Sequence, residues 1–260
     1  MSRRPWRWCS AALLGFWLAA LAGPSAAAEA VILCYHRFGP TVADGMTTRT
    51  ATFEQQIARL KAEGHQFVAL DTVIEGLRGR KPLPEKAVAI TIDDGHTTVY
   101  SDLLPIVQRE HLPVTLFVYP SAISNASYAM TWEQLQALKD TGYFTIEAHT
   151  YWHPNFRTEK KRLDAEAYAK FVKVQLEKPR QVLARRLGVQ ADVLAWPFGI
   201  HDAELEAAAA AAGYRAALAL EERPAAATDS PFALPRFLIV DASGVNGLSK
   251  LIQSRSTKQP

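Results

Sequence analysis

The chain has 260 residues, with 29 lysines and arginines against 26 aspartates and glutamates, which gives a formal net charge of +3. Three of the arginines lie within the first seven residues, so residues 29–260 carry 26 basic and 26 acidic side chains and no net charge. This balance excludes the strongly basic surface of a nucleic-acid-binding protein and gives no reason to expect binding to an anionic membrane. The length allows one large α/β domain.

Residues 1–28 have the pattern of a secretory signal peptide. Arginines precede an apolar stretch from Ala11 to Ala22, and the small residues 25–28 then form a cleavage site. The stretch is short for a membrane span, and no cysteine is placed for lipid attachment. We therefore expect a secreted protein, periplasmic or extracellular, with one domain over residues 29–260 and no stable membrane anchor after signal cleavage. The pattern does not indicate an oligomeric state.

Short β-branched runs alternate with amphipathic segments along the rest of the chain. Strands are predicted at residues 31–35, 67–70, 87–92, 114–118, 144–148, 193–195, 215–220 and 234–240. Helices are predicted from Thr52 (with a capping box to Gln55) to Gly64, from Asp71, at 98–110, from Thr131 to Gly142, at 164–187 with a break at Pro179, at 202–212 and near the C-terminus. This alternation is typical of a parallel sheet, either closed or doubly wound.

Polar residues follow two of the predicted strands directly. Asp93 and Asp94 come after residues 87–92, and His149 and His153 come after residues 144–148. Taken singly, the first pair could belong to a surface turn, and the histidines could be unrelated surface residues. Two neutral imidazoles and one carboxylate, however, form a common hydrolytic metal site with a position left for water. Their placement at strand ends, which converge at the mouth of a (β/α) barrel, favours a barrel with a metal site there.

These residues resemble three motifs of the polysaccharide deacetylases, the family 4 carbohydrate esterases that share the NodB homology domain. Residues 91–95 are similar to Thr-Phe-Asp-Asp-Gly, and residues 149–154 are similar to a motif with two histidines four positions apart and a final proline. Residues 195–199 resemble the third motif, Arg-x-Pro followed by Tyr or Phe. The resemblance runs from about Val31 to Ile239 and implies an α/β fold, a distorted (β/α)7 barrel formed by a single domain.

The resemblance also implies the chemistry of the site. Asp94, His149 and His153 correspond to the ligands of a divalent metal, with Zn²⁺ the first expectation. Asp93 corresponds to the general base that takes a proton from water. The implied reaction is hydrolysis of an N-acetyl group.

The sequence departs from the family motifs at two places, so two roles that these motifs imply must be taken by other residues. Many members carry a late Leu-x-His motif that supplies the general acid, but the last histidine here is His201. His36, after the first strand, is our candidate for the acid, with His96 and His201 as competitors and a surface turn as the alternative for His36. Ala195 replaces the arginine of the third motif, and Arg236 is our candidate replacement, unless it forms an ordinary structural ion pair.

Residues 34–38, 195–199 and 234–236 together look most like the branch of the family that deacetylates poly-β-1,6-N-acetylglucosamine. We therefore predict a metal-dependent hydrolase that removes N-acetyl groups from an exported polysaccharide. Peptidoglycan or chitin-oligosaccharide deacetylation, ester cleavage on acetylated xylan and non-catalytic glycan binding remain alternatives. The predicted substrate-binding residues are Trp196, Pro197, Phe198 and Arg236. Cys34 is expected to be a buried core thiol.

Overall fold

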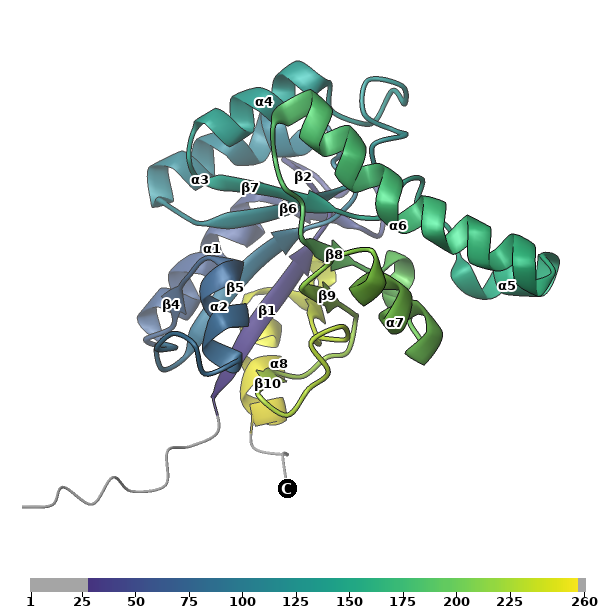
Figure 1. Ribbon diagram of the computed structural model, residues 1–260. Coiled ribbons are helices and arrows are strands. Elements are labelled where there is room, and N and C mark those ends of the chain that lie inside the picture. The colour runs from purple at the N-terminus through teal and green to yellow at the C-terminus, as the bar shows by residue number, and fades with distance from the viewer. Residues whose placement is uncertain (1–27, 257–260) are drawn as a thin grey trace, which may run out of the picture.

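The computed structural model describes residues 28–256, and at its centre lies a curled sheet of parallel strands (Figure 1). Six of these strands lie side by side in the order β1, β5, β6, β7, β8 and β9. Their bounds are Glu29–Tyr35 for β1, Ala87–Ile92 for β5, Val114–Val118 for β6, Phe144–Ala148 for β7, Val193–Ala195 for β8 and Ala216–Leu218 for β9. Every neighbouring pair in this row is parallel, so the carboxyl ends of the strands lie at one end of the sheet.

The central strands β1 and β5 are apolar because both of their faces are buried. Leu33 and Tyr35 belong to a large core shared with most of the helices. Ile32, which alternates with them along β1, and Ala89, which lies opposite Ile32 on β5, belong to a second core. Helix α2 (Leu70–Leu77) packs on this second core.

A last segment connects the two edges of the row. Leu234 accepts a hydrogen bond from the backbone N–H of Ala219 at 2.8 Å, next to β9. Three residues later, β11 (Phe237–Leu238) pairs in parallel with β1, where Phe237 lies opposite Leu33. The curled sheet thereby approaches a ring of seven parallel strands, and the predicted single-domain α/β barrel fold is confirmed.

Short strands extend this framework at its margins. β10 (Ala225–Ala226) pairs antiparallel with the start of β1, and β4 (Gln66–Phe67) pairs with the start of β5. A separate two-stranded sheet is formed by β2 (Arg37–Gly39) and β3 (Thr47–Arg49). It begins directly after β1 and therefore lies next to the carboxyl ends of the central strands.

The remaining helices pack on the large core. Their bounds are Thr50–Ala62 for α1, Leu104–Glu110 for α3, Trp132–Asp140 for α4, Phe156–Arg162 for α5, Ala165–Leu187 for α6, Ala203–Ala211 for α7 and Val245–Ser256 for α8. Figure 1 shows α5 and the first turns of α6 projecting from the body of the domain. The predicted capping box of Thr131 and Gln134 is present at the start of α4.

The predicted start of the first helix is wrong. Helix α1 begins at Thr50 with Arg49 as N-cap, and no side chain caps it. Thr52 instead lies inside the first turn and is buried. The chain enters the helix straight from β3, and Asp241, distant in sequence, accepts a hydrogen bond from the backbone N–H of Arg49 at 3.0 Å. A capping partner of this kind cannot be read from local sequence.

Two further expectations are corrected by packing. The predicted strand at residues 67–70 ends at Phe67, because Leu70 already belongs to the buried face of α2. Helix α6 continues through Pro179 without a break. Val172 and Leu183, on either side of the proline, are both buried in the core, and this packing outweighs the hydrogen bond that proline removes. Helix α5 was not predicted, although Asn155 caps it.

The predicted signal peptide, residues 1–28, lies outside the described residues except for Ala28. Among the described helices, none combines the length and apolar character needed to cross a membrane. Cys34 is a free thiol with 0% exposure, as expected for a core residue.

Candidate active site

Side chains from the carboxyl ends of four strands line one cavity with a volume of about 580 Å³. His36 follows β1, Asp93 follows β5, Tyr119 follows β6 and His149 follows β7. Residues more than one hundred positions apart in sequence therefore meet because their strands are parallel neighbours. Asp94 and His153 line the same cavity.

Both carboxylates reach the cavity because the chain turns sharply after β5. Asp94 and Gly95 have left-handed backbone conformations, with φ of 74° and 75°. A Cβ atom at position 95 would lie 3.0 Å from Cγ1 of Val118 and 3.1 Å from Cδ1 of Ile123, so this position also needs the small volume of glycine. The turn places two carboxylates together in a buried site, which requires a cation or a proton nearby.

Asp94, His149 and His153 form a cluster suited to a metal ion. The Oδ1 atom of Asp94 lies 3.7 Å from Nε2 of His149 and 3.6 Å from Nε2 of His153. Ligands placed 2.0–2.2 Å from one tetrahedral ion would lie about 3.4 Å from one another, close to these separations. The same Oδ1 atom is buried and has no hydrogen-bond partner. An unpartnered buried carboxylate oxygen between two imidazole nitrogens therefore fits a divalent ion.

His149 is held in the form that binds metals. Its Nδ1 lies 2.7 Å from the carbonyl oxygen of Ala195, which can only accept a hydrogen bond, so Nδ1 carries the proton. Nε2 is then left with a free lone pair facing Asp94. Complete burial lowers the pKa of His149 to about 3, so the ring is neutral at ordinary pH. Ala195, which departs from the family motif, thus still contributes through its backbone carbonyl.

His153 is placed by a loop that turns twice into the left-handed region. Thr150 has φ of 63° and His153 has φ of 62°. The hydroxyl of Thr150 accepts a hydrogen bond from the backbone N–H of His153 at 3.2 Å. The buried Gln175 of α6 accepts hydrogen bonds from the two intervening backbone N–H groups, of Tyr151 and Trp152. The loop is therefore fixed to the core, and the four-residue spacing brings both imidazoles to one side.

Asp93 lines the cavity on one side and forms an ion pair with Arg236 on its buried side. Nη1 and Nη2 of Arg236 each donate to one carboxylate oxygen of Asp93 at 2.8 Å, and the two side chains are 0% and 2% exposed. Burial by itself would raise the pKa of Asp93, but the charge of Arg236 and the hydrogen bonds from it hold that pKa well below its usual range. Asp93 is thus an anion in a fixed orientation.

Arg236 is held in turn by groups on several strands. Its Nε donates to the carbonyl oxygen of Ala219 at 3.1 Å, and Nη1 also donates to the hydroxyl of Thr91 at 3.0 Å. The thiol of Cys34 donates to Oδ2 of Asp93 at 3.4 Å. The carboxylate that faces the metal cluster is thereby surrounded by donors on its buried side.

The polysaccharide deacetylase family model matches residues 80–217, more than half of the chain. The chain belongs to the polysaccharide deacetylase family. It is 24% identical to the poly-beta-1,6-N-acetyl-D-glucosamine N-deacetylase of Escherichia coli K12 over 265 residues, which cover 88% of this chain and 39% of that protein. It is 25% identical to the protein of the same name from Staphylococcus aureus MRSA252 over 194 residues, which cover 73% of this chain and 66% of that one. The chain thus spans less than two thirds of either relative.

Solved structures of deacetylases share this fold. The Streptococcus pyogenes deacetylase PplD, in complex with acetate, has a TM-score of 0.77 at 20% identity, over 87% of this chain and 99% of that one. IcaB from Ammonifex degensii has a TM-score of 0.73 at 24% identity, over 86% of this chain and 96% of that one. The chain therefore has the same fold as these two structures over 86–87% of its length.

The cavity that holds Asp94, His149 and His153 contains one of the three histidines considered for the general acid. His36 lines it, and the Nδ1 atom of this ring is buried without a hydrogen-bond partner. Nδ1 of His96 instead bonds the hydroxyl of Thr98 at 2.9 Å, and Nδ1 of His201 bonds Glu206 at 2.9 Å. Neither of these two lines the cavity. The geometry therefore favours His36 over both competitors.

The predicted substrate-binding residues fall into two groups. Phe198 is 59% exposed, lines the cavity, and packs edge-on against His153 with ring centroids 4.6 Å apart. Trp196 is fully buried and donates from Nε1 to the carbonyl oxygen of Phe232 at 2.9 Å, and Pro197 is also buried. Arg236 lies behind Asp93 rather than in the cavity. In this structure Phe198 is thus the member of the set that can touch a ligand, because the other three side chains are covered by protein.

Sequence reasoning missed six residues that line the cavity, namely Arg37, Met46, Tyr119, Tyr128, Leu220 and Leu238. Tyr119 could have been found, because it directly follows a predicted strand as Asp93 and His149 do. Tyr119 is neither a metal ligand of the usual kind nor part of one of the three family motifs, so no role was predicted for it. Met46 and Tyr128 lie in loops, which carry no periodic signal.

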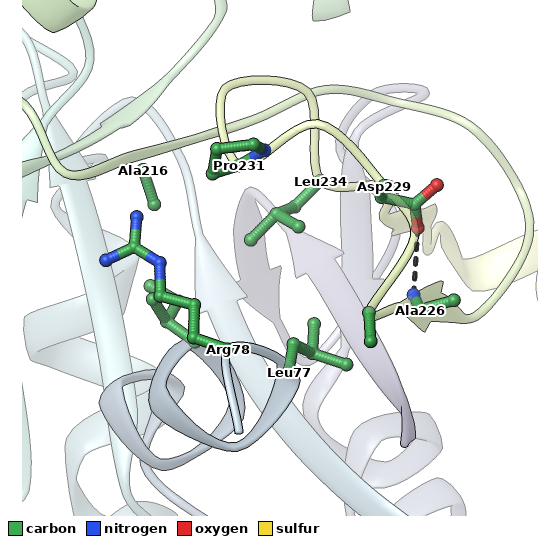
Figure 2. Close-up of a pocket in the computed structure, with 9 residues that line it drawn as sticks. Leu77, Arg78, Ala216, Ala226, Asp229, Pro231 and Leu234 are labelled. Carbon is green, nitrogen blue, oxygen red and sulfur yellow. Dashed lines mark hydrogen bonds between the residues drawn. The ribbon is translucent and has the colours of Figure 1, made fainter. Parts of the chain in front are cut away.

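A second pocket, with a volume of about 150 Å³, lies at the amino end of the strands (Figure 2). Leu77, Leu234 and Pro231 give it mainly apolar walls. Its acidic side chain, Asp229, accepts a hydrogen bond from the backbone N–H of Ala226 at 2.8 Å, as Figure 2 shows. It lacks the converging polar atoms of the cavity around Asp94, His149 and His153, which is therefore the candidate active site.

Proposed function

We propose that this protein is a metal-dependent N-deacetylase that removes acetyl groups from N-acetylglucosamine residues of an exported polysaccharide. The observation that carries the proposal is that two groups of residues lie in one cavity. One is the cluster of Asp94, His149 and His153, with its unpartnered buried oxygen. The other is Asp93, held as an anion by Arg236. Together these are the parts that hydrolysis of an amide needs.

Asp94, His149 and His153 would hold the metal, and their chemistry fits Zn²⁺ first among divalent ions. When bound, such an ion supplies Lewis-acid polarisation of an acyl oxygen and of the attacking water. The hydrogen bond from His149 to the carbonyl of Ala195 orients this ligand before any metal arrives.

Asp93 would accept the proton that the attacking water loses. Its Oδ2 atom lies 3.7 Å from Nε2 of His149, so a water molecule near the ligand cluster is within its reach. Arg236 keeps the carboxylate ionised and fixes its orientation, which is the role that the arginine of the third family motif would otherwise have. The departure at Ala195 is thus compensated by a residue that directly precedes β11.

His36 would donate a proton to the departing amine. An amine leaves poorly as an anion, so the breaking of the C–N bond requires a proton donor close to the nitrogen. Imidazole is the side chain best suited to this task near neutral pH. His36 lines the same cavity, where one of its ring nitrogens lies within 4.8 Å of a carboxylate oxygen of Asp93, and its Nδ1 has no hydrogen-bond partner among the described residues.

The polymer is inferred from the relatives. Both relatives described above are named as deacetylases of poly-beta-1,6-N-acetyl-D-glucosamine, although this chain spans only part of their length. An exported polymer also agrees with the signal peptide predicted at residues 1–28. An open cavity with the exposed Phe198 at its edge offers an apolar surface for a sugar ring.

The test is acetate release by metal-loaded protein from a panel of N-acetylated glycans. We expect release from oligomers of β-1,6-linked N-acetylglucosamine in preference to chitin oligosaccharides, peptidoglycan and acetylated xylan. Preferred release from one of the other three would replace the proposed polymer by that one. Binding of a glycan without any release of acetate would favour a non-catalytic binding protein instead.

A further inference from the structure

Two tyrosines form part of the cavity wall next to the metal cluster. The hydroxyl oxygens of Tyr119 and Tyr128 lie 2.5 Å apart, and both side chains line the cavity. The ring centroid of Tyr119 lies 5.3 Å from that of His153 and 6.4 Å from that of His149. The pair therefore lies beside the imidazoles that would hold the metal. The catalytic roles proposed above make no use of it.

The hydrogen bonds of this pair leave one donor free. Each hydroxyl has one proton, and one of the two protons is used in the bond between them. Among the described residues, neither hydroxyl has another hydrogen-bond partner. The second proton is therefore available to an acceptor that enters the cavity.

Tyr128 is held in a fixed position relative to the catalytic turn. Its carbonyl oxygen accepts a hydrogen bond from the backbone N–H of Thr97 at 2.8 Å, and Met130 donates to the carbonyl of Gly95 at 3.0 Å. The ring of His96 stacks on that of Tyr128, with centroids 6.2 Å apart and planes 13° apart. These bonds connect the loop that carries Tyr128 to the segment that follows Asp94. The tyrosine hydroxyls are therefore held at a fixed distance from Asp94, His149 and His153.

Two parts of the cavity wall are suited to a sugar ring. The tyrosine pair offers a neutral donor on one wall, and the exposed ring of Phe198, which packs on His153, offers an apolar surface. A sugar ring presents oxygen acceptors at its edge and C–H groups on its face, so it matches both. We propose that the Tyr119–Tyr128 pair positions the substrate by donating a hydrogen bond to an oxygen of the N-acetylated sugar unit at the metal centre. This inference rests on the proposed function.

The test replaces one hydroxyl at a time and leaves the ring in place. Tyr128→Phe is the first variant because this side chain is 41% exposed, so it should fold normally. We expect KM for an N-acetylglucosamine oligomer to rise about 10-fold with little change in kcat, since a bond made equally before and during reaction affects binding alone. Tyr119→Phe should have an effect in the same direction. With a small acetyl ester that cannot span the cavity, the change in kcat/KM should be smaller.

Tyr143→Phe is the matched control. It also removes a hydroxyl hydrogen bond, the one to Nδ1 of His111 at 2.6 Å, but Tyr143 is half-buried and does not line the cavity. It should leave KM unchanged, and metal content and the unfolding midpoint should be measured for all three variants. If Tyr128→Phe and Tyr119→Phe keep the KM of an active wild-type enzyme, or raise KM no more than Tyr143→Phe does, the inference is wrong. A wild-type protein that releases no acetate would instead contradict the proposed function.

Discussion

Arg236→Met should be among the most damaging single substitutions in this protein. The guanidinium is 0% exposed and donates to both oxygens of Asp93, to Thr91 and to the carbonyl of Ala219. Methionine fills part of the space but leaves a buried carboxylate without its counter-ion. Loss of one partner of a buried ion pair typically costs about 3–5 kcal/mol of folding free energy. In a domain of this size that corresponds to a fall of about 6–20 °C in the unfolding midpoint.

The assay is thermal unfolding of four proteins, which are the wild type, Arg236→Met, Asp93→Asn and the double variant. Asp93→Asn removes the charge that Arg236→Met leaves uncompensated, so the double variant should be more stable than the sum of the two single losses predicts. Arg49→Met is the matched control, because Arg49 also pairs with a carboxylate, that of Asp241 at 3.0 Å, but its side chain is 51% exposed. A surface pair of this kind should change the midpoint only slightly.

Two results would refute this reasoning. One is an Arg236→Met protein that unfolds at the temperature of the wild type. The other is strict additivity of the two single losses in the double variant, which would mean that the ion pair seen in the structure has no energetic coupling. Activity is recorded alongside, and Arg236→Met should also lose turnover because Asp93 loses its fixed orientation.

The remaining predictions concern catalysis and pH. Asp94→Asn or His149→Ala should remove most of the bound metal, measured by elemental analysis, and nearly all activity, because three ligands hold the ion; stoichiometric metal in either variant would exclude that residue as a ligand. Asp93→Asn should keep the metal but lower turnover by about 10²–10⁴, the usual loss of a general base; loss of metal instead would reverse the two aspartates. His36→Ala should keep fold and metal, lower acetate release, and regain part of it with added imidazole; unchanged turnover would exclude His36 as the acid. Burial raises the pKa of Glu147 to about 8, above its value in the unfolded chain. As pH rises the unfolded state therefore loses this proton first, and the free energy of unfolding falls between about pH 4.5 and 8. Glu147→Gln should reduce the difference in unfolding midpoint between pH 5 and pH 8, and an undiminished difference would contradict this assignment.

Much of the site could be predicted because its residues follow strands. The β-branched runs before Asp93 and His149 identify buried parallel strands, and the carboxyl ends of such strands meet at one edge. The same logic reached His36, whereas Arg236 was considered because the third family motif lacks its arginine here. These predictions depend on the direction of strands, which a sequence shows well.

The rest depends on which way a side chain turns and on contacts distant in sequence. The third motif contains Trp196 and Phe198 two positions apart, but the left-handed φ of 57° at Phe198 turns the second ring outward while the first is buried. The start of α1 depends on Asp241, nearly two hundred residues away. Tyr128 reaches the cavity from a loop that is positioned by backbone bonds to Gly95 and Thr97. None of these has a periodic or compositional signal.

The most direct test of the account is acetate release by the same protein before and after removal of its metal. The protein is treated with a chelator, dialysed, and assayed with an N-acetylglucosamine oligomer before and after addition of one equivalent of Zn²⁺. The account predicts no acetate from the chelated protein and recovery of release with one metal ion per chain. Continued release of acetate by protein shown to contain no metal would contradict it.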